Sequence, residues 1–369
     1  MRLGIEVEYW LADEDGALVP ADGIISTCEG VDPEMIEPLL EVKTPPCDSF
    51  EELVDAFVER LGAVRDEARS RGRRLVPLGT PLTNECFDHR SKTRIEVQSA
   101  VLGDALAHAG HCAGTHIHFE QDEPLDQIRV LTALDPAFAL VNTSPYYRGE
   151  RLTECARPYV YRRMCYASFE GHGQLWRYPD TVEEWRGRVD KRYERFVEEA
   201  TERGVDSGTV EDRFSPADAL WTPVCLRDDL GTVEWRTPDA APPLDLCRLV
   251  DDVSDVVEKA VEEGTEVDGA VHTDGTVAVP PFGTLTDYVD VAIRDGLSDG
   301  RVERYLSRFG FDTDEYGPVS ERIPEGLSID NETARSLRLR AADRLDRELR
   351  NLREEGYEAV DEAPSAVSD

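Results

Sequence analysis

Alternating apolar and polar residues predict a series of short strands that carry charged side chains on one face. In the stretch 3–11, Glu6 and Glu8 share one face of the pleat, while Ile5 and Val7 share the other, because successive side chains of a strand point in opposite directions. Further strands are predicted at residues 39–43, 74–78, 114–120 and 232–237. The first strand therefore projects two carboxylates together.

Helical periodicity and capping signals predict what lies between these strands. Ser49 with Glu52, and Thr181 with Glu184, form capping boxes, in which a hydroxyl and a carboxylate satisfy the free amides at the start of a helix. Helices are predicted to begin there and to end near residues 71 and 202, and others at residues 126–134, from residue 137, and at residues 244–263, 285–295 and 332–355. The stretches 79–92 and 142–149 are predicted to be loops.

The order of these elements predicts one α+β domain. The strands are unevenly spaced, polar motifs extend from residue 6 to residue 236, and no internal repeat or strong domain boundary interrupts them. A single domain over residues 1–355, built on a mostly antiparallel sheet flanked by helices, is the simplest arrangement. The acidic stretch 356–369 has few apolar residues, so we predict a disordered tail there.

Acidic side chains outnumber basic ones along the whole chain. The 369 residues include 77 acidic and 41 basic side chains, and the net charge at pH 7 is −36. Such a charge argues against a protein that binds nucleic acid or an anionic membrane. No apolar run approaches the roughly 20 residues that a membrane span needs, and Glu6 and Glu8 interrupt any signal-peptide core. We therefore expect a cytoplasmic protein.

Lysine is rare in this chain. Only four of the 41 basic residues are lysines. An acidic chain that uses arginine for nearly every positive charge suits very high salt, where self-repulsion among carboxylates is screened. We interpret it as a haloarchaeal protein; an ordinary acidic cytosolic enzyme is the alternative. The eight cysteines form no Cys-x-x-Cys pair, so neither structural zinc nor a disulfide framework is expected.

Carboxylates at strand positions where inward-facing side chains are expected give the strongest chemical signal. Glutamates at four such positions, Glu6, Glu8, Glu41 and Glu234, are joined by His116. Converging carboxylates repel one another and resist burial unless hard divalent cations lie between them. Together they predict a magnesium cluster. Each one alone would more often lie on the solvated face of a sheet.

A second signal is a pair of histidines on one strand face. His116 and His118 stand at i and i+2, where two imidazoles can bind a metal or a phosphate oxygen. His108, His111 and Cys112 lie nearby, but their spacing does not match a zinc site. We expect His108, His111 and His118 to be satisfied structural histidines.

The third signal lies in the last predicted strand. Glu234 and Arg236 share a face there, which would place a metal-binding carboxylate beside a permanently charged guanidinium suited to phosphate. An ordinary ion pair within a strand is the alternative. The chain contains no Walker A loop, no G-x-G-x-x-G and no G-x-S-x-G. If ATP is used, strand carboxylates and magnesium would have to hold it.

Five motifs occur in one order and carry a family resemblance. They are Gly4-Ile5-Glu6-Val7-Glu8-Tyr9, Glu41-Val42-Lys43-Thr44-Pro45-Pro46-Cys47, Gly114-Thr115-His116-Ile117-His118, Asn142-Thr143-Ser144-Pro145 and Thr232-Val233-Glu234-Trp235-Arg236-Thr237-Pro238-Asp239. Together they resemble the glutamate-cysteine ligase type 2 family of carboxylate-amine ligases, within the glutamine synthetase-like superfamily. The resemblance covers about residues 1 to 295.

The resemblance implies a fold, two cofactors and a set of site residues. The fold is a curved, mostly antiparallel sheet that forms a funnel, with ATP and Mg²⁺ held by strand carboxylates. By similarity, the metal ligands would be Glu6, Glu8, Glu41, His116 and Glu234. Glu8, His116 and Arg236 would contact the nucleotide, and the catalytic groups would be Arg236, His116 and Glu234.

The implied reaction is ATP-dependent amide formation through γ-glutamyl phosphate, from L-glutamate and L-cysteine to γ-glutamylcysteine. Cysteine follows from the family and from the halophilic composition, and a ligase that uses another amine is one alternative. A non-catalytic relative that binds nucleotide or amino acid is a second. A cupin-like metal site is a third, although Glu120 follows His118 too soon for that pattern. Arg94 and Arg148 are candidates for binding a substrate carboxylate, or else ordinary surface charges.

Overall fold

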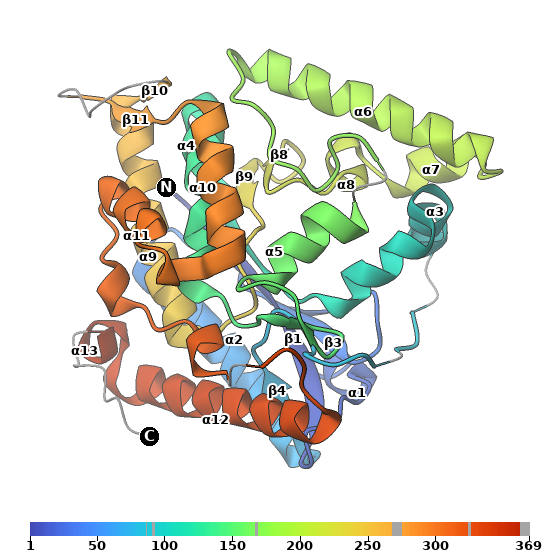
Figure 1. The fold of residues 1–369 in the computed structure, drawn as a ribbon, viewed down its shortest axis with the longest axis vertical. Helices are drawn as coiled ribbons and strands as arrows, with labels where there is room; N and C mark the ends of the chain where they lie inside the picture. The colour runs from blue at the N-terminus through green and yellow to red at the C-terminus, as the bar shows by residue number, and fades with distance from the viewer. Residues whose placement is uncertain (86, 91–92, 167–168, 268–274, 324–325, 362–369) are drawn as a thin grey trace.

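The computed structural model has a seven-stranded antiparallel sheet at its centre (Figure 1). It describes residues 1–85, 87–90, 93–166, 169–267, 275–323 and 326–361. The strands run in the order β2-β3-β1-β5-β9-β8, and β4 pairs with the end of β1. Their bounds are β1 (Leu3–Asp13), β2 (Val31–Pro33), β3 (Leu39–Lys43), β4 (Arg73–Val76), β5 (Thr115–Glu120), β8 (Val224–Arg227) and β9 (Thr232–Trp235).

All five predicted strands are confirmed within a few residues of their expected ends. The short β2 and β8 were not predicted. Strand β2 has three residues, too few for an alternation to be recognised, and the sequence of β8, Val-Cys-Leu-Arg, does not alternate between apolar and polar residues. Two small sheets lie outside the main one. They are β6 (Tyr146–Tyr147) with β7 (Glu150–Arg151), antiparallel, and β10 (Thr265–Val267) with β11 (Val277–Val279), parallel.

Helices cover both faces of the sheet. They are α1 (Asp22–Ile25), α2 (Phe50–Ser70), α3 (Thr93–Leu102), α4 (Pro124–Ala133), α5 (Ala156–Val160), α6 (Val182–Glu202), α7 (Ser207–Arg213), α8 (Pro216–Ala219), α9 (Pro243–Glu263), α10 (Phe282–Asp295), α11 (Gly300–Leu306), α12 (Asn331–Glu355) and α13 (Tyr357–Asp361). Helix α2 packs on β1, β3 and β4, and α4 packs on β8 and β9. The helix predicted from residue 137 is instead a 3₁₀ segment, Asp135–Val141.

The two predicted capping boxes start helices as expected. The Ser49 hydroxyl accepts the Glu52 amide at 3.2 Å, and the Thr181 hydroxyl accepts the Glu184 amide at 3.1 Å. Each glutamate carboxylate in turn accepts an amide just before its helix. These local interactions explain why α2 and α6 begin where the sequence predicts.

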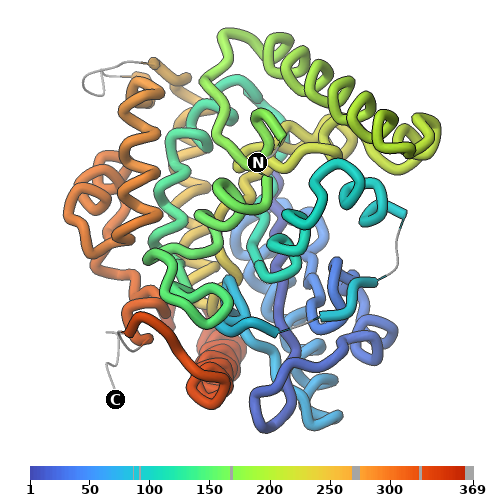
Figure 2. The backbone as a smooth tube through the Cα atoms, turned by 45° about the vertical axis from the view of Figure 1, so that its right-hand side comes forward, coloured from blue at the N-terminus to red at the C-terminus, as the bar shows by residue number. Residues whose placement is uncertain are grey.

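The C-terminal part of the chain packs against the start of the sheet. Helix α12 lies along one edge of the molecule, beside β4 and α2 (Figures 1 and 2). The buried Arg338 on α12 donates to the Pro81 carbonyl at 3.1 Å and to the Glu85 carboxylate at 2.5 Å. A second arginine, Arg344, binds both carboxylate oxygens of Asp245 on α9 at 2.7 Å. Buried guanidinium groups therefore tie this helix to the rest of the fold.

The prediction of a disordered tail is wrong for residues 357–361. These residues form α13, in which Val360 is buried and Asp361 pairs with Arg248 at 2.5 Å. Burial of Val360 together with a charged partner supplies contacts that a composition argument cannot foresee. Residues 362–369 lie outside the described residues, and a single domain over residues 1–355 stays a prediction. In the described part of the chain, every helix is too short or too polar to cross a membrane.

Candidate active site

Strands β1 and β3 bring four charged side chains to one face of the sheet. Their register pairs Glu8 with Glu41 and Glu6 with Lys43. Directly opposite residues of antiparallel strands share a face, so the alternation within β1 sets the direction of all four. The prediction that Glu6 and Glu8 project together is confirmed, and Glu41 lies beside them.

Strands β5 and β9 continue this row of polar side chains. Glu6 lies opposite His116, and His118 lies opposite Glu234. His116 Nδ1 is 3.2 Å from Glu234 Oε1 and 3.6 Å from Glu6 Oε2. His118 Nε2 is 3.8 Å from each of the same two oxygens. Three neighbouring strands, β1, β5 and β9, thus gather two carboxylates and two imidazoles.

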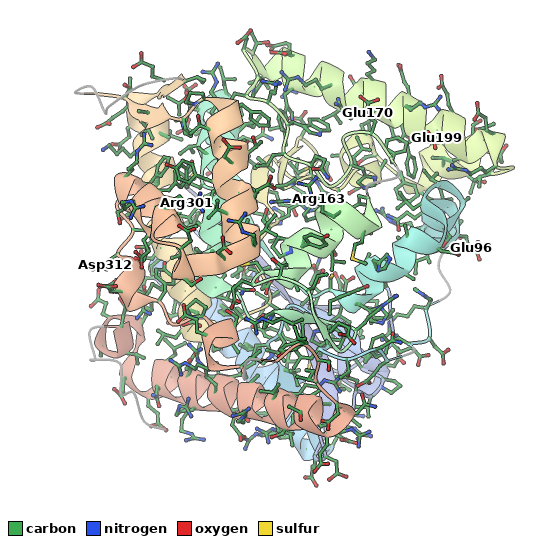
Figure 3. The ribbon with its side chains drawn as sticks, in the orientation of Figure 1. Glu96, Arg163, Glu170, Glu199, Arg301 and Asp312 are labelled. Atoms are coloured by element: carbon green, nitrogen blue, oxygen red, sulfur yellow. The ribbon has the colours of Figure 1, made fainter. Side chains whose placement is uncertain are left out.

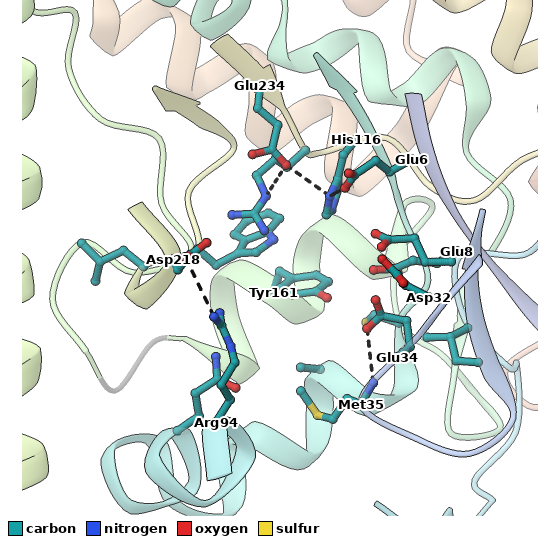
Figure 4. Close-up of a pocket in the computed structure, with 18 of the residues that line it drawn as sticks. Glu6, Glu8, Asp32, Glu34, Met35, Arg94, His116, Tyr161, Asp218 and Glu234 are labelled. Atoms are coloured by element: carbon teal, nitrogen blue, oxygen red, sulfur yellow. Dashed lines mark hydrogen bonds and ion pairs between the residues drawn. The ribbon is translucent and has the colours of Figure 1, made fainter. Parts of the chain in front are cut away.

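This polar face forms one wall of a cavity of about 710 Å³, a volume typical of small-molecule sites. Figure 4 shows Glu6, Glu8 and Glu234 facing the cavity from the sheet, with Arg94 on the opposite side. All six site residues predicted from the sequence line the cavity, namely Glu6, Glu8, Glu41, His116, Glu234 and Arg236.

Glu234 and Arg236 form an ion pair within the cavity wall. Arg236 Nε lies 3.2 Å from Glu234 Oε1, and the Glu234 side chain is only 1% exposed. Burial raises the pKa of Glu234, but Arg236 and His116 outweigh it and lower that pKa. Burial lowers the pKa of Arg236, and Glu234 more than restores it. Both groups are therefore charged at neutral pH, as binding of a cation and of a phosphate requires.

His118 has a ring nitrogen in the cavity wall that lacks a partner. Its Nδ1 lies 3.1 Å from the Thr232 hydroxyl, whereas its buried Nε2 has no hydrogen-bond partner among the described residues. Glu234 Oε2 also lacks a hydrogen-bond partner among the described residues, although Arg227 Nη1 lies 3.5 Å from it. The prediction that His118 is a satisfied structural histidine is therefore wrong. The sequence showed that His116 and His118 share a face, but not which nitrogen each leaves free.

The donor atoms of the cavity fit a divalent cation. Glu6, His118 and Glu234 each offer one ligand atom, and these atoms lie within 4.8 Å of one another. Two of these residues carry the unpartnered atoms, whose burial costs free energy that coordination to a cation would recover. The other two groups of this kind are Glu6, Glu41 and His116, and Glu8, Glu34 and Glu41. All five predicted magnesium ligands belong to these groups, and their role as ligands stays a prediction.

Glu41 lies among further charges at the β3 side of the cavity. Burial raises the pKa of Glu41 well above its ordinary range, and Glu34 and Glu6 raise it further. The Lys43 ammonium, 2.7 Å from Glu41 Oε2, acts in the opposite direction. For Glu6, burial also raises the pKa, but the neighbouring His116 and His118 outweigh it and lower that pKa below its usual range. Carboxylates this close together are stabilised by any positive charge placed between them.

A buried arginine, Arg157, holds the backbone that follows β9 next to this wall. Arg157 donates to the carbonyl oxygens of Thr237 at 2.8 Å and Pro238 at 3.1 Å. A Cβ at Gly114 would lie only 1.8 Å from Arg157 Nη2, so any side chain there would require the buried Arg157 to shift. The Gly114 amide donates to Glu8 Oε2 at 2.6 Å. Burial raises the pKa of Glu8 to about 7, while Arg157 lowers it.

Aromatic residues form a part of the cavity wall that sequence analysis missed. The rings of Tyr161 and Trp221 stack at 4.5 Å, and those of Tyr166 and His172 stack at 4.0 Å. Burial lowers the pKa of His172 to about 3, and the charge of Arg236 adds to this effect. The imidazole is therefore neutral at physiological pH. These residues come from short irregular segments between α5 and β8, where no periodic pattern marks them.

Two histidines outside the sheet, His108 and His111, serve the structure. The two ring nitrogens of His111 lie 3.0 Å from the carbonyl oxygens of Ala107 and Glu85. His108 Nδ1 lies 2.5 Å from the Tyr147 hydroxyl. The prediction that His108 and His111 are satisfied structural histidines is confirmed, and their contacts leave no basis for a zinc site.

Three other charged residues were considered from the sequence, namely Glu120, Arg94 and Arg148. Glu120 accepts a hydrogen bond from Arg2 Nε at 2.9 Å and belongs to none of the possible metal-ligand groups among the described residues, which disfavours a cupin-like metal site. Arg94 lines the cavity, 3.9 Å from Asp218. The Arg148 guanidinium instead lies 5.3 Å from the centre of the neighbouring tyrosine ring. Of the two arginines predicted to bind a substrate carboxylate, only Arg94 is in place to do so.

Comparison with known proteins identifies related sequences. Residues 2–301 match the family described as Glutamate-cysteine ligase family 2 (GCS2). A protein of Frankia casuarinae is 28% identical over 263 residues, which cover 66% of this chain and 62% of the relative. A Halobacterium salinarum protein named glutamate–cysteine ligase is 25% identical over 254 residues, 64% of each chain. The matches thus span less than two thirds of the length of these relatives.

A solved structure supports the fold. The crystal structure of a bifunctional glutathione synthetase from Pasteurella multocida superimposes with a TM-score of 0.56 at 14% sequence identity. The superposition covers 94% of this chain and 52% of that chain. The predicted α+β fold with an antiparallel sheet flanked by helices is therefore confirmed. Since the family match extends over residues 2–301 of 369, the chain belongs to glutamate-cysteine ligase family 2.

Proposed function

We propose that this chain is an ATP-dependent ligase that joins the γ-carboxylate of L-glutamate to the amine of L-cysteine. The observation that carries this proposal is a group of possible metal ligands beside a largely buried guanidinium in one cavity. The group consists of Glu6, His118 and Glu234, and the guanidinium is that of Arg236. Membership of glutamate-cysteine ligase family 2 supports the class of reaction.

The reaction needs a good leaving group because a carboxylate is a poor electrophile. An oxygen of the γ-carboxylate attacks the γ-phosphorus of ATP, the bond to ADP breaks, and γ-glutamyl phosphate results. The acceptor amine then attacks the carbonyl carbon, loses a proton and expels phosphate, which leaves the amide. Both steps depend on positioning and charge stabilisation. No nucleophilic side chain is required, so we assign no catalytic role to the cysteines.

The residues of the cavity divide this work by their charge. We assign Arg236 to the oxygens of the transferred phosphoryl group, because a guanidinium is planar and permanently charged. His116 and Glu234 lie within 3.2 Å of each other, and we place both beside the reacting phosphate. Magnesium, when bound, supplies further stabilisation of negative charge on that group. Its proposed ligands are Glu6, Glu8, Glu41, His116 and Glu234, together with His118, whose Nε2 has no hydrogen-bond partner in the described chain.

L-Cysteine is the acceptor that we favour. The relative from Halobacterium salinarum bears the name glutamate–cysteine ligase. The net charge of −36 and the scarcity of lysine suit a protein that works at high salt. A ligase with another amine acceptor would use the same ATP chemistry, so the acceptor is tested separately from the reaction class.

ADP release at molar KCl tests both parts of the proposal. The assay contains ATP, Mg²⁺ and L-glutamate, with L-cysteine, a panel of other amines or no amine, and the product mass is determined. We expect cysteine to accelerate ADP release and the product to have the mass of γ-glutamylcysteine. ADP release with a different amine alone would keep the ligase and replace the acceptor. Failure with every acceptor would contradict the proposal and favour a non-catalytic relative.

A further inference from the structure

Lys43 is a lysine placed where this chain otherwise uses arginine. Its Nζ lies 2.7 Å from Glu41 Oε2, 3.2 Å from Glu6 Oε1 and 3.4 Å from Asp32 Oδ2. Only four of the 41 basic residues of the chain are lysines. Of the others within the described chain, Lys191 is exposed on α6 and Lys259 is half-exposed on α9. Lys43 is therefore the described lysine that lies within a group of three carboxylates.

The chemistry of an ammonium group explains why lysine stands at this position. An ammonium is a compact charge with three N–H donors, and three carboxylate oxygens surround it here. A guanidinium spreads its charge over a planar fork, which matches one or two carboxylates lying in its plane better than three that converge on a point. The backbone of Lys43 is held on both sides, because its amide donates to Gly30 and its carbonyl accepts Arg60 Nη1. The ammonium is thus directed into the carboxylate group from a fixed strand.

The three groups of possible metal ligands differ in how their atoms are already used. In the first group, Arg236 Nε lies 3.2 Å from Glu234 Oε1 and Arg227 Nη1 lies 3.5 Å from Oε2, but the buried His118 Nε2 has no hydrogen-bond partner among the described residues. In the group formed by Glu6, Glu41 and His116, Lys43 Nζ already contacts both carboxylates. A positive charge there offsets the repulsion that a divalent cation would otherwise offset.

We infer that the Lys43 ammonium is a built-in cation that occupies the position between Glu6 and Glu41. Because the ammonium fills that position, the cavity binds one divalent cation fewer than it would bind without the Lys43 charge. The group with Glu6, His118 and Glu234 remains available to a metal ion, while the Lys43 position is filled by the protein itself. This inference rests on the proposed function, in which the carboxylate face of the cavity binds magnesium. It concerns the number of ions bound and can be measured without turnover.

Binding of Mn²⁺ alone tests the inference. Mn²⁺ accepts the same oxygen and nitrogen ligands as magnesium, and free Mn²⁺ is counted by its paramagnetic resonance signal during titration of the full chain. Molar KCl screens weak binding to the acidic surface. We expect Lys43→Met to bind one more Mn²⁺ per chain than the unaltered protein. An equal number of ions in both proteins would overturn the inference.

A matched control removes the same charge elsewhere. Lys259 lies 4.0 Å from Glu263, its one ion-pair partner among the described residues, and its side chain is 51% exposed. Lys259→Met therefore alters the net charge as Lys43→Met does, and it should leave the number of bound Mn²⁺ ions unchanged. A gain of one ion in Lys259→Met as well would attribute the effect to net charge and overturn the inference.

Two further variants keep the test decisive if Lys43→Met does not fold. Lys43→Gln also removes the ammonium and should gain the ion. Lys43→Arg keeps the charge and should not. Failure of the ligase assay together with an extra ion in Lys43→Gln would contradict the proposed function and support the inference. Ligase activity with no extra ion in Lys43→Met or Lys43→Gln would support the proposed function and overturn the inference.

Discussion

At the scale of single residues, buried polar atoms without partners mark the chemistry of the cavity. Most buried polar atoms of a folded protein are hydrogen-bonded, because an unsatisfied one costs free energy. His118 Nε2 and Glu234 Oε2 are exceptions within the described chain, and His118 Nε2 lies 3.8 Å from Glu6 Oε2 and from Glu234 Oε1. The nearby Arg236 adds a positive charge that this space holds permanently. These atoms are where a bound cation and a phosphate are expected.

Glu234→Gln tests the carboxylate at the centre of this group. The amide has nearly the same shape but no charge, so it loses attraction for both a cation and Arg236. We expect ADP release to fall by about 10²–10³-fold or more. The melting temperature and circular dichroism should show that the variant is folded. A wild-type rate would remove Glu234 from the site.

We predict that removal of either strand histidine, His116 or His118, impairs the site. Because His118 Nε2 has no hydrogen-bond partner in the described chain, we expect His118→Ala to weaken Mn²⁺ binding about 10–100-fold. His116→Ala should lower kcat as well, since its Nδ1 lies 3.2 Å from Glu234 Oε1. His108→Ala, outside the cavity, is the control for the loss of an imidazole. Unchanged Mn²⁺ affinity in His118→Ala would return His118 to a structural role.

The sequence was sufficient to predict which residues line the charged face of the cavity, but several of their contacts were not predictable. Glutamates at inward strand positions made Glu6, Glu8, Glu41 and Glu234 visible in the sequence, because alternation gives the direction of a side chain. The partners of each atom depend on strand register, which the sequence alone does not supply. For that reason the free Nε2 of His118 and the contacts of Lys43 emerge only from the structure.

At the scale of elements, the register of four strands assembles the site. The row formed by β3, β1, β5 and β9 brings residues far apart in the chain into direct opposition. Gly114 at the start of this region leaves room for Arg157, whose guanidinium occupies the space that a side chain would need. The same arginine holds the backbone that follows β9. A change at Gly114 should therefore affect both sides of the cavity.

Gly114→Ala is predicted to destabilise the fold and impair the site. The new methyl group would lie 1.8 Å from Arg157 Nη2, and overpacking of this kind costs about 1–3 kcal/mol. Gly187→Ala is the control, because nothing lies within 4 Å of a Cβ at Gly187 on α6. There alanine should stabilise the helix by about 1 kcal/mol. Urea unfolding measures both free energies, and equal effects would contradict the role of Arg157.

The elements with strong local signals were predicted, and those defined by tertiary contacts were missed. Helices α2 and α6 carry capping boxes and β1 a clear alternation, so their positions followed from the sequence. The strand β8 is four residues long and pairs only with β9. Helix α13 depends on the burial of Val360 and on the Arg248–Asp361 pair. Such contacts arise between distant segments and leave no local pattern.

At the scale of the whole molecule, charge is the dominant property. The net charge is −36, and labelled acidic residues such as Glu96, Glu170 and Asp312 are exposed at the periphery (Figure 3). Carboxylates at this density repel one another and disfavour the compact state at low salt. Helix α12 lies after the family match, and its arginines pair with Glu85 and with Asp245 of α9. Stability should therefore depend strongly on ionic strength.

Thermal unfolding in KCl tests this dependence. The Debye length falls from about 10 Å at 0.1 M to about 3 Å at 1 M, so the melting temperature should rise by several degrees over that range. Tetramethylammonium chloride at equal ionic strength should give a similar rise, because screening does not depend on the identity of the cation. A melting temperature that is constant or falls with KCl would contradict the halophilic interpretation.

The central claim is that the γ-carboxylate of glutamate is activated by phosphorylation. Glutamate labelled with ¹⁸O in both γ-carboxylate oxygens tests this most directly, because the bridging oxygen of γ-glutamyl phosphate leaves with the phosphate when the amine attacks. We expect one ¹⁸O in each phosphate released with γ-glutamylcysteine, measured by mass spectrometry at molar KCl. Phosphate without label, released alongside the amide, would contradict it.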